Sequence, residues 1–175
     1  MMSTPAHYGM FAAYNAWANR RLYDAAAQLS DADYRADRKA FFGSLHRTLN
    51  HLMVGDRIWM HRFDGEGETY LELDRVLYDD FAALRAAREA EDARIVRYAE
   101  GLTDAVLAGE LEYRNTQGIA FVSPLAPMLD HFFNHQTHHR GQAHALISAA
   151  GIVPPPLDLL VWIRENGVMR VKESA

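Results

Sequence analysis

The stretch His131–His144 of this 175-residue chain reads HFFNHQTHHRGQAH and holds five of its nine histidines. Ser123-Pro124 supplies a helix start before this stretch, and Gly151 stands where a left-handed cap would end the helix. The sequence therefore predicts one long helix between these points. Leu129 and other apolar residues lie beside the histidines, so the imidazole rings belong to the face that turns toward a core.

The histidines of this helix are spaced to share one face. With about 100° per residue, His131, His135, His138 and His139 fall together, whereas His144 lies about 220° round from His131. His135 and His139 are one helical turn apart, the spacing by which two imidazoles bind one metal ion. His131 and His135 have the same spacing, so two overlapping pairs are available. Imidazoles packed together without a ligand would leave polar nitrogens unpartnered, which favours a metal site over hydrogen-bonded core histidines.

A third ligand has to come from another helix. His51 is the best candidate, because it lies among apolar residues in the middle of the predicted second helix, whereas His46 and His61 lie nearer its ends. His7 is close to the N-terminus and is expected to be solvated. Neutral imidazole suits zinc, nickel, copper and iron(II). Zinc with three imidazole ligands keeps one coordination position open, which suits a bound water or a thiolate as nucleophile.

Asp56 lies on the apolar side of the second helix, one turn from Leu52 and Met60. Its role is open between a partner for a ligand histidine, a substrate contact and a carboxylate paired with an arginine. Asp56 or His131 could also supply a fourth ligand that closes the coordination shell of the metal.

Two asparagines, Asn15 and Asn19, stand inside the predicted first helix, where their helix propensity is poor. We expect one of them to make a buried hydrogen bond. The rings of Trp17, Trp59 and Trp162 are most simply interpreted as core.

The rest of the chain is also predicted to be mostly helical. Apolar stripes predict helices over roughly 5–28, 44–63 and 77–100, and alternating residues predict a short β-hairpin over roughly 109–123. A short acidic turn follows the cap residue Ser30, and a final short helix, Leu159–Glu165, has Asp158 as its cap. Four long helices with short connections predict an all-α four-helix bundle with a small β-hairpin before the fourth helix, forming one domain over residues 1–175.

The composition excludes several classes of protein. Hydrophobic residues make up 49% and charged residues 23%, as in ordinary globular domains. Cysteine is absent, which excludes disulfides, a cysteine nucleophile and cysteine-ligated metal sites in this chain. The net charge of −5 argues against nucleic-acid binding. No apolar run approaches the ~20 residues of a membrane span, and the N-terminus does not have the pattern of a signal peptide, so a cytoplasmic location without membrane contact is expected. No phosphate-binding glycine motif or G-x-S-x-G elbow is present.

Four segments resemble the DinB/YfiT-like family. They are NHQTHHRGQ (134–142), YNAWANRRL (14–22), LNHL (49–52) and PPLD (155–158). The resemblance covers residues 8–165, and the first of these motifs is specific. It implies an up-down-down-up four-helix bundle, commonly dimeric.

The resemblance also implies a divalent metal ion held by three histidines. By motif position these are His51, His135 and His139, whereas His131 and His138 match no ligand position. Zinc or nickel is expected, with iron or manganese as further options. Some members of the wider group look like metal-dependent hydrolases or transferases that use low-molecular-weight thiols, including mycothiol-dependent isomerases.

Two classes of function are therefore carried forward. The first is a metal-dependent hydrolase or small-thiol transferase, a homodimer that acts on a small organic substrate in a pocket between the second and fourth helices. The second is a non-catalytic metal-binding stress-response protein whose metal is structural. An open coordination position favours the first, and a fourth protein ligand favours the second.

Overall fold

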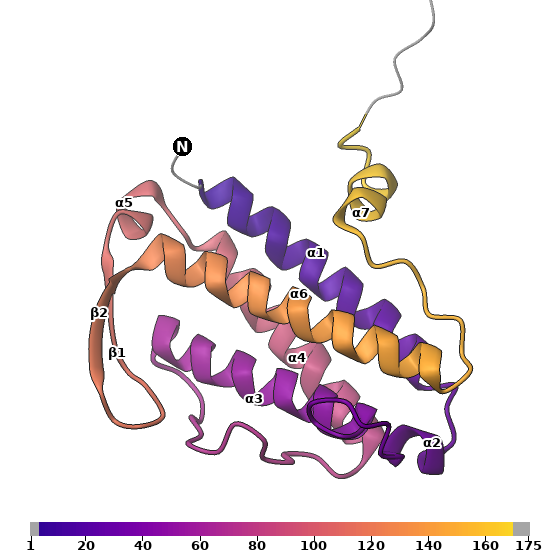
Figure 1. Cartoon of the computed structure of the whole chain (residues 1–175). Helices are drawn as coiled ribbons and strands as arrows, with labels where there is room; N and C mark the ends of the chain where they lie inside the picture. The colour runs from indigo at the N-terminus through magenta and orange to yellow at the C-terminus, as the bar shows by residue number, and fades with distance from the viewer. Residues whose placement is uncertain (1–3, 170–175) are drawn as a thin grey trace, which may run out of the picture.

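The computed structural model describes residues 4–169, in which four long helices lie side by side with a hairpin at one end (Figure 1). The long helices are α1 (Pro5–Ala26), α3 (Leu45–Asp64), α4 (Phe81–Glu100) and α6 (Leu125–Ala149). The shorter elements are α2 (Asp31–Arg35), α5 (Asp104–Leu107), β1 (Glu110–Arg114), β2 (Ala120–Pro124) and α7 (Leu159–Glu165). Within this range no helix combines the length and apolar character that a membrane crossing needs.

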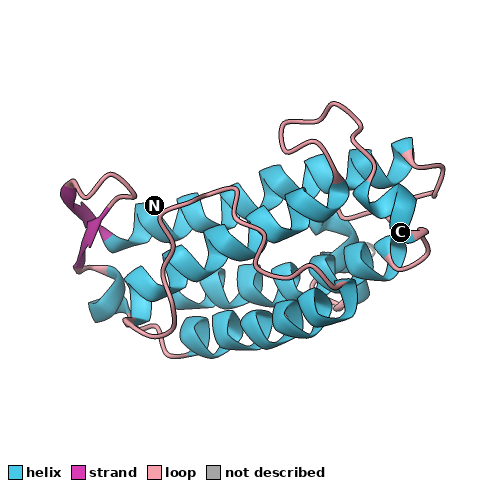
Figure 2. Cartoon of the chain, turned by 90° about the horizontal axis from the view of Figure 1, so that it is seen from below, coloured by secondary structure: helices cyan, strands magenta, loops and turns pink. Residues whose placement is uncertain are grey.

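The long helices follow the predicted up-down-down-up course. α1 and α6 run in the same direction, since the Tyr8 hydroxyl donates to the Ala126 carbonyl, 2.9 Å away, near the start of both helices. α3 and α4 both run the other way, and the segment 65–80 returns along the bundle to join them (Figure 1). Figure 2 shows the hairpin beyond one end of the helices. The predicted four-helix bundle with a small hairpin is confirmed.

Side-chain caps explain where several helices begin. The Thr4 hydroxyl accepts from the His7 amide, and the Ser30 and Ser44 side chains cap α2 and α3 in the same way. In the sequence, Ser3 and Thr4 precede Pro5 and together predict a cap for this helix; Ser3 lies outside the described residues. Gly151 has φ +88°, the left-handed conformation expected just after α6.

Two helix starts differ from the prediction, and one short helix was not predicted. α4 begins at Phe81 instead of residue 77, because Asp80 caps it by accepting from the Ala83 amide at 2.7 Å. Leu77 lies in a bend before this cap, and its amide donates to Asn50 Oδ1 at 2.8 Å, which holds it outside the helix. Pro124 ends β2, so α6 starts one residue later, and the helix α5 was not predicted. Asp158 stands at the N-cap position of α7 but makes no capping bond with its side chain.

The hairpin forms as predicted. β1 pairs with β2 in antiparallel register, with Leu111 opposite Ser123. Asn115 Oδ1 accepts from the amides of Gln117 and Ile119, and Gly118 takes φ +81°, which closes the turn.

The core lies between the four long helices. Leu49, Met53 and Ile147 belong to one buried cluster, and Met60 and Phe132 to a second one nearer the hairpin. Of the three tryptophans only Trp162 is buried. Trp17 and Trp59 are half-buried and pack against two of the buried clusters, so they border the core instead of lying inside it. Each ring is instead covered on one side by an arginine, Arg21 and Arg62 respectively.

Candidate metal centre

Three histidines from α3 and α6 meet at one point. The Nε2 atoms of His51 and His139 are 3.1 Å apart, and those of His139 and His135 are also 3.1 Å apart. One nitrogen from each ring lies within 4.8 Å of the other two. Nitrogens that share a zinc ion at about 2.0–2.1 Å lie roughly 3–3.5 Å from one another. The spacing of the three rings therefore fits a common metal ion.

The hydrogen bonds of the Nδ1 atoms, which face away from the meeting point, show that the Nε2 atoms facing it carry lone pairs. His51 Nδ1 lies 2.7 Å from the Leu73 carbonyl oxygen, and His139 Nδ1 lies 2.8 Å from Gln142 Oε1. Because both oxygens are acceptors, both Nδ1 atoms donate, and each neutral ring has a lone pair on Nε2. Two such acceptors 3.1 Å apart cannot hydrogen-bond to each other, whereas a cation between them would satisfy both. The donor set therefore fits a metal better than it fits a metal-free core.

The place of His135 depends on Gly55 of α3. A Cβ atom at position 55 would come within 3.0 Å of His135 Cε1, so any side chain there would press on the ring. Glycine in a helix interior costs about 1 kcal/mol of stability relative to alanine. The close approach of the His135 ring explains why position 55 nevertheless holds a glycine. The Nδ1 atom of His135 is buried without a hydrogen-bond partner among residues 4–169.

Burial keeps the three rings neutral. Desolvation, reinforced by the neighbouring imidazoles, lowers the pKa of His135 to about 3. Desolvation also lowers the pKa of His139 to about 4, although the hydrogen bond to Gln142 opposes it. The pKa of His51 is lowered as well, again mainly by burial. Metal ligands must be unprotonated, so the three rings are in the right form at neutral pH.

The profile of the DinB family matches residues 2–168. The chain belongs to the DinB family.

Two DinB relatives extend this result. Protein DinB of Bacillus subtilis (strain 168) is 24% identical over 163 residues, which cover 86% of this chain and 90% of that protein. A DinB-like protein from Bacillus cereus ATCC 10987, whose crystal structure is known, is 22% identical with a TM-score of 0.69. The structural match covers 89% of this chain and 99% of that one, and it shows that the two share a fold.

The walls of this DinB-family site come from neighbouring segments. Phe42 stacks on His51 with ring centroids 4.0 Å apart, and covers one face of that ring. The Leu73 carbonyl group lies at the Nδ1 side of the His51 ring and accepts its hydrogen bond. The His131 ring lies 5.8 Å from that of His135 and 5.0 Å from that of Trp59, and it is exposed. It is a neighbour of the three-histidine cluster and not a member of it.

The structure does not bring Asp56 to the cluster. Its carboxylate, which is 1% exposed, accepts from Arg88 of α4. Arg88 also faces Asp92 one turn along the same helix, at 3.0 Å. The arginine-paired reading of Asp56 is therefore the one that the structure supports. In residues 4–169, His51, His135 and His139 are joined by no fourth histidine or carboxylate.

The two asparagines complete this buried network. Asn15 Nδ2 and Asn19 Nδ2 donate to Asp92 Oδ1 at 3.2 and 2.9 Å. Arg140 of α6 in turn donates to Asn15 Oδ1. All four long helices thus meet through buried polar groups, and both asparagines, rather than one, make buried bonds.

The remaining histidines lie elsewhere. His46 Nε2 is 3.2 Å from the Tyr78 carbonyl, and His61 Nδ1 is 3.2 Å from the Glu66 carbonyl. His138 is exposed, and Gln142 Nε2 approaches its Nε2 at 3.2 Å. His7 was expected to be solvated, but it is half-buried because its ring packs 4.8 Å from Phe11.

Sequence reasoning missed Gly55, Gln142, Leu73 and Phe42 as parts of the site. Gly55 had a signal, since a glycine inside an apolar helix suggests close approach of another group. Gln142 shared the helix face of the histidines. The loop residues had no signal, because their place depends on how residues 36–44 and 65–80 fold over α3.

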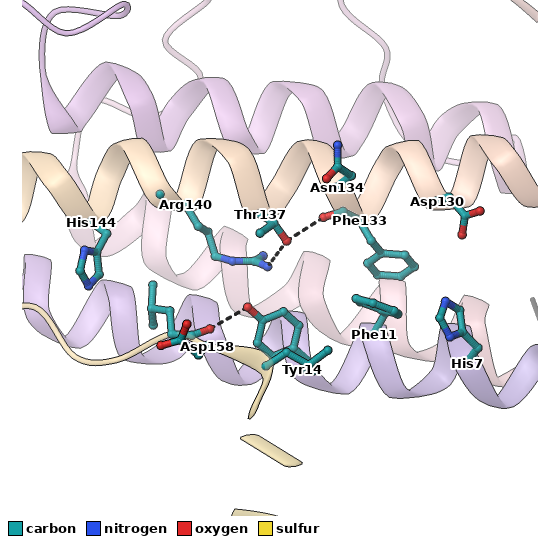
Figure 3. Close-up of a pocket in the computed structure, with 13 residues that line it drawn as sticks. His7, Phe11, Tyr14, Asp130, Phe133, Asn134, Thr137, Arg140, His144 and Asp158 are labelled. Carbon is teal, nitrogen blue, oxygen red and sulfur yellow. Dashed lines mark hydrogen bonds between the residues drawn. The ribbon is translucent and has the colours of Figure 1, made fainter. Parts of the chain in front are cut away.

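A cavity of about 610 Å³ lies on another face of α6. Figure 3 shows it between Phe11 and Tyr14 of α1 and Phe133 of α6, with His144 at one end. His144 thus points away from the cluster, as its helical angle predicted. None of the three clustered histidines lines this cavity, so it is not the pocket expected between the second and fourth predicted helices.

Proposed function

We propose that this DinB-family protein binds one divalent metal ion, zinc or nickel, through His51, His135 and His139, and uses it in catalysis on a small organic substrate. The reaction class is hydrolysis or transfer that depends on a low-molecular-weight thiol. The observation that carries this proposal is the convergence of the Nε2 atoms, two of which have their lone pairs fixed toward each other at 3.1 Å.

The residues around the cluster would hold the three imidazole rings in place for the metal. The Leu73 carbonyl and Gln142 hold the tautomers and ring orientations of His51 and His139. Gly55 leaves the room that His135 occupies. Phe42 shields one side of His51 from water. A divalent ion with three neutral imidazole ligands supplies Lewis acidity and an open coordination position.

The alternative is a metal-binding stress-response protein without turnover. A structural zinc site is usually closed by a fourth protein ligand. Asp56 is engaged by Arg88, and His131 is turned toward Trp59. The lack of a fourth ligand among the described residues therefore favours the catalytic proposal.

Metal analysis followed by an activity screen tests the proposal. Purified protein should contain close to one zinc or nickel ion per chain. The loaded protein should turn over an ester, amide or thiol-plus-electrophile pair, and chelation should abolish this. Stoichiometric metal without activity across the screen would support the non-catalytic alternative, and absence of binding would refute both.

Acid should destabilise the metal-free protein partly through these rings. Their folded-state pKa values lie below the ordinary 6.5, so the unfolded chain takes up more protons as the pH falls. The stability that the three neutral rings contribute is fully present above about pH 6.5 and is lost as the pH falls toward about 3–4. Over this range the free energy of unfolding falls by up to about 1.4 kcal/mol per pH unit for each ring.

Urea unfolding of chelated protein between about pH 7 and pH 4 would measure this effect. Wild-type protein should lose more stability over this range than His135→Leu, which lacks one of the titrating rings. Equal losses would show that His135 titrates normally in the folded state.

A further inference from the structure

A second hollow lies over the seam between α1 and α4, away from the metal centre. It has a volume of about 580 Å³, within the range of small-molecule sites. Ala16 on α1 and Ala93 on α4 leave it open, because neither side chain reaches across the seam. We call it the α1–α4 groove and define it by Ala16, Arg20, Tyr23, Arg88, Ala93 and Arg97.

The floor of the groove holds buried donors without acceptors. Tyr23 and Arg88 are 2% and 3% exposed. The Tyr23 hydroxyl and the Nε atom of Arg88 have no hydrogen-bond partner among residues 4–169. Such groups are costly to bury unless something accepts from them. Both therefore point to a ligand that carries an acceptor.

The lining of the groove holds four arginines against two carboxylates, those of Glu89 and Asp92, so it carries a net positive charge. Arg20 and Arg97 are exposed, and neither forms an ion pair with any part of the chain that the structure describes. Arg85, by contrast, is already paired with Asp24 and Glu89. On a chain with a net charge of −5, two free guanidinium groups beside one hollow are a local exception. Guanidinium groups bind carboxylates and phosphates well.

We propose that the α1–α4 groove binds a small amphipathic organic anion. Its apolar body would lie on Ala16, Ala93 and the half-buried Val96. Its carboxylate, sulfonate or phosphate group would lie between Arg20 and Arg97. An acceptor atom would reach the Tyr23 hydroxyl and Arg88 Nε.

Titration with 8-anilinonaphthalene-1-sulfonate, an aromatic anion that fluoresces in apolar sites, tests the proposal on the full chain. Wild-type protein should bind one equivalent. The variant Ala93→Leu should abolish this binding by filling the groove, and Ala86→Leu, an exposed alanine of α4 outside the groove, should leave it unchanged. The double variant Arg20→Gln/Arg97→Gln should weaken binding by about tenfold or more and remove most of its salt dependence. Arg164→Gln, an exposed arginine of α7, is the matched charge control.

Other outcomes would overturn the proposal. Failure of the wild-type protein to bind the probe, or equal binding by the groove variants, would do so. Dimerisation that Ala93→Leu abolishes would show that the groove is an interface between copies of the chain. Because all variants leave the three-histidine cluster intact, metal content measured in parallel separates this result from a failure of the proposed function.

Discussion

Replacing Arg88 with methionine should lower the free energy of unfolding by about 3–5 kcal/mol. Arg88 is 3% exposed and lies between Asp56 and Asp92, which are 1% and 7% exposed. Methionine would fill similar space but leave two buried carboxylates without a counter-charge. Burial already raises the pKa of Asp92 to about 6 while Arg88 is present. Urea denaturation followed by circular dichroism would measure the loss.

The matched control is Arg85→Met on the same helix. Arg85 pairs with Asp24 and Glu89 near the surface, so its loss should cost no more than about 1 kcal/mol. The penalty in Arg88→Met should also be smaller at about pH 5 than at about pH 8, because the stranded carboxylates can then take up protons. Similar losses for both variants, or a penalty that does not change with pH, would contradict this account of the core.

Replacing His51, His135 or His139 with alanine should each remove most of the bound metal. Metal that binds only the folded state stabilises it by about 4 kcal/mol at a thousandfold excess over the dissociation constant. Each variant should lose most of that gain, because two remaining imidazoles hold the ion weakly. Metal content after gel filtration, and the shift in melting temperature on adding zinc or nickel, would measure both effects.

The other histidines of α6 provide the controls. His144→Ala should keep the metal, since the His144 ring hydrogen-bonds to the Pro155 carbonyl on the face of α6 opposite the cluster. His131→Ala should also keep it, because His131 is outside the cluster. Loss of metal in His131→Ala with retention in His139→Ala would show that the other pair binds the ion. If none of these replacements matters, the cluster is core packing.

A smaller loss of metal affinity is expected when a residue that contacts a ligand ring, and not the ring itself, is replaced. Gln142→Leu removes the acceptor that orients His139 but keeps the three ligand rings. Metal affinity should fall by about 10–100-fold, the usual cost of losing such a partner. An unchanged affinity would mean that the geometry of His139 is held by packing alone.

Much of the fold could be predicted because its signals are local. The cap residues Thr4, Ser30 and Ser44 stand next to the helices that they start, and Gly118 next to the turn that it closes. The start of α4 was misplaced because the signal was not local. Leu77 continues an apolar stripe, but Asn50, 27 residues earlier, binds its amide and keeps it out of the helix.

The candidate site divides in the same way. The shared face of His135 and His139 follows from the geometry of one helix, so the sequence alone determined it. The choice between the two overlapping pairs did not, because His131 and His139 are each one turn from His135. The family resemblance favoured His135 with His139, and the register of α3 against α6 agrees with it, because it places His51 beside His139 and Trp59 beside His131.

The role of Asp56 also depended on the tertiary structure. A carboxylate on an apolar helix face must find a partner, and this much the sequence determined. The partner is Arg88, 32 residues away on a helix that packs against α3 only in the finished bundle. Spacing along one helix is a property of the chain itself, whereas contacts between helices depend on how all four pack. For that reason the sequence determined the bundle, its hairpin and the row of histidines, and the tertiary structure decided which polar groups meet.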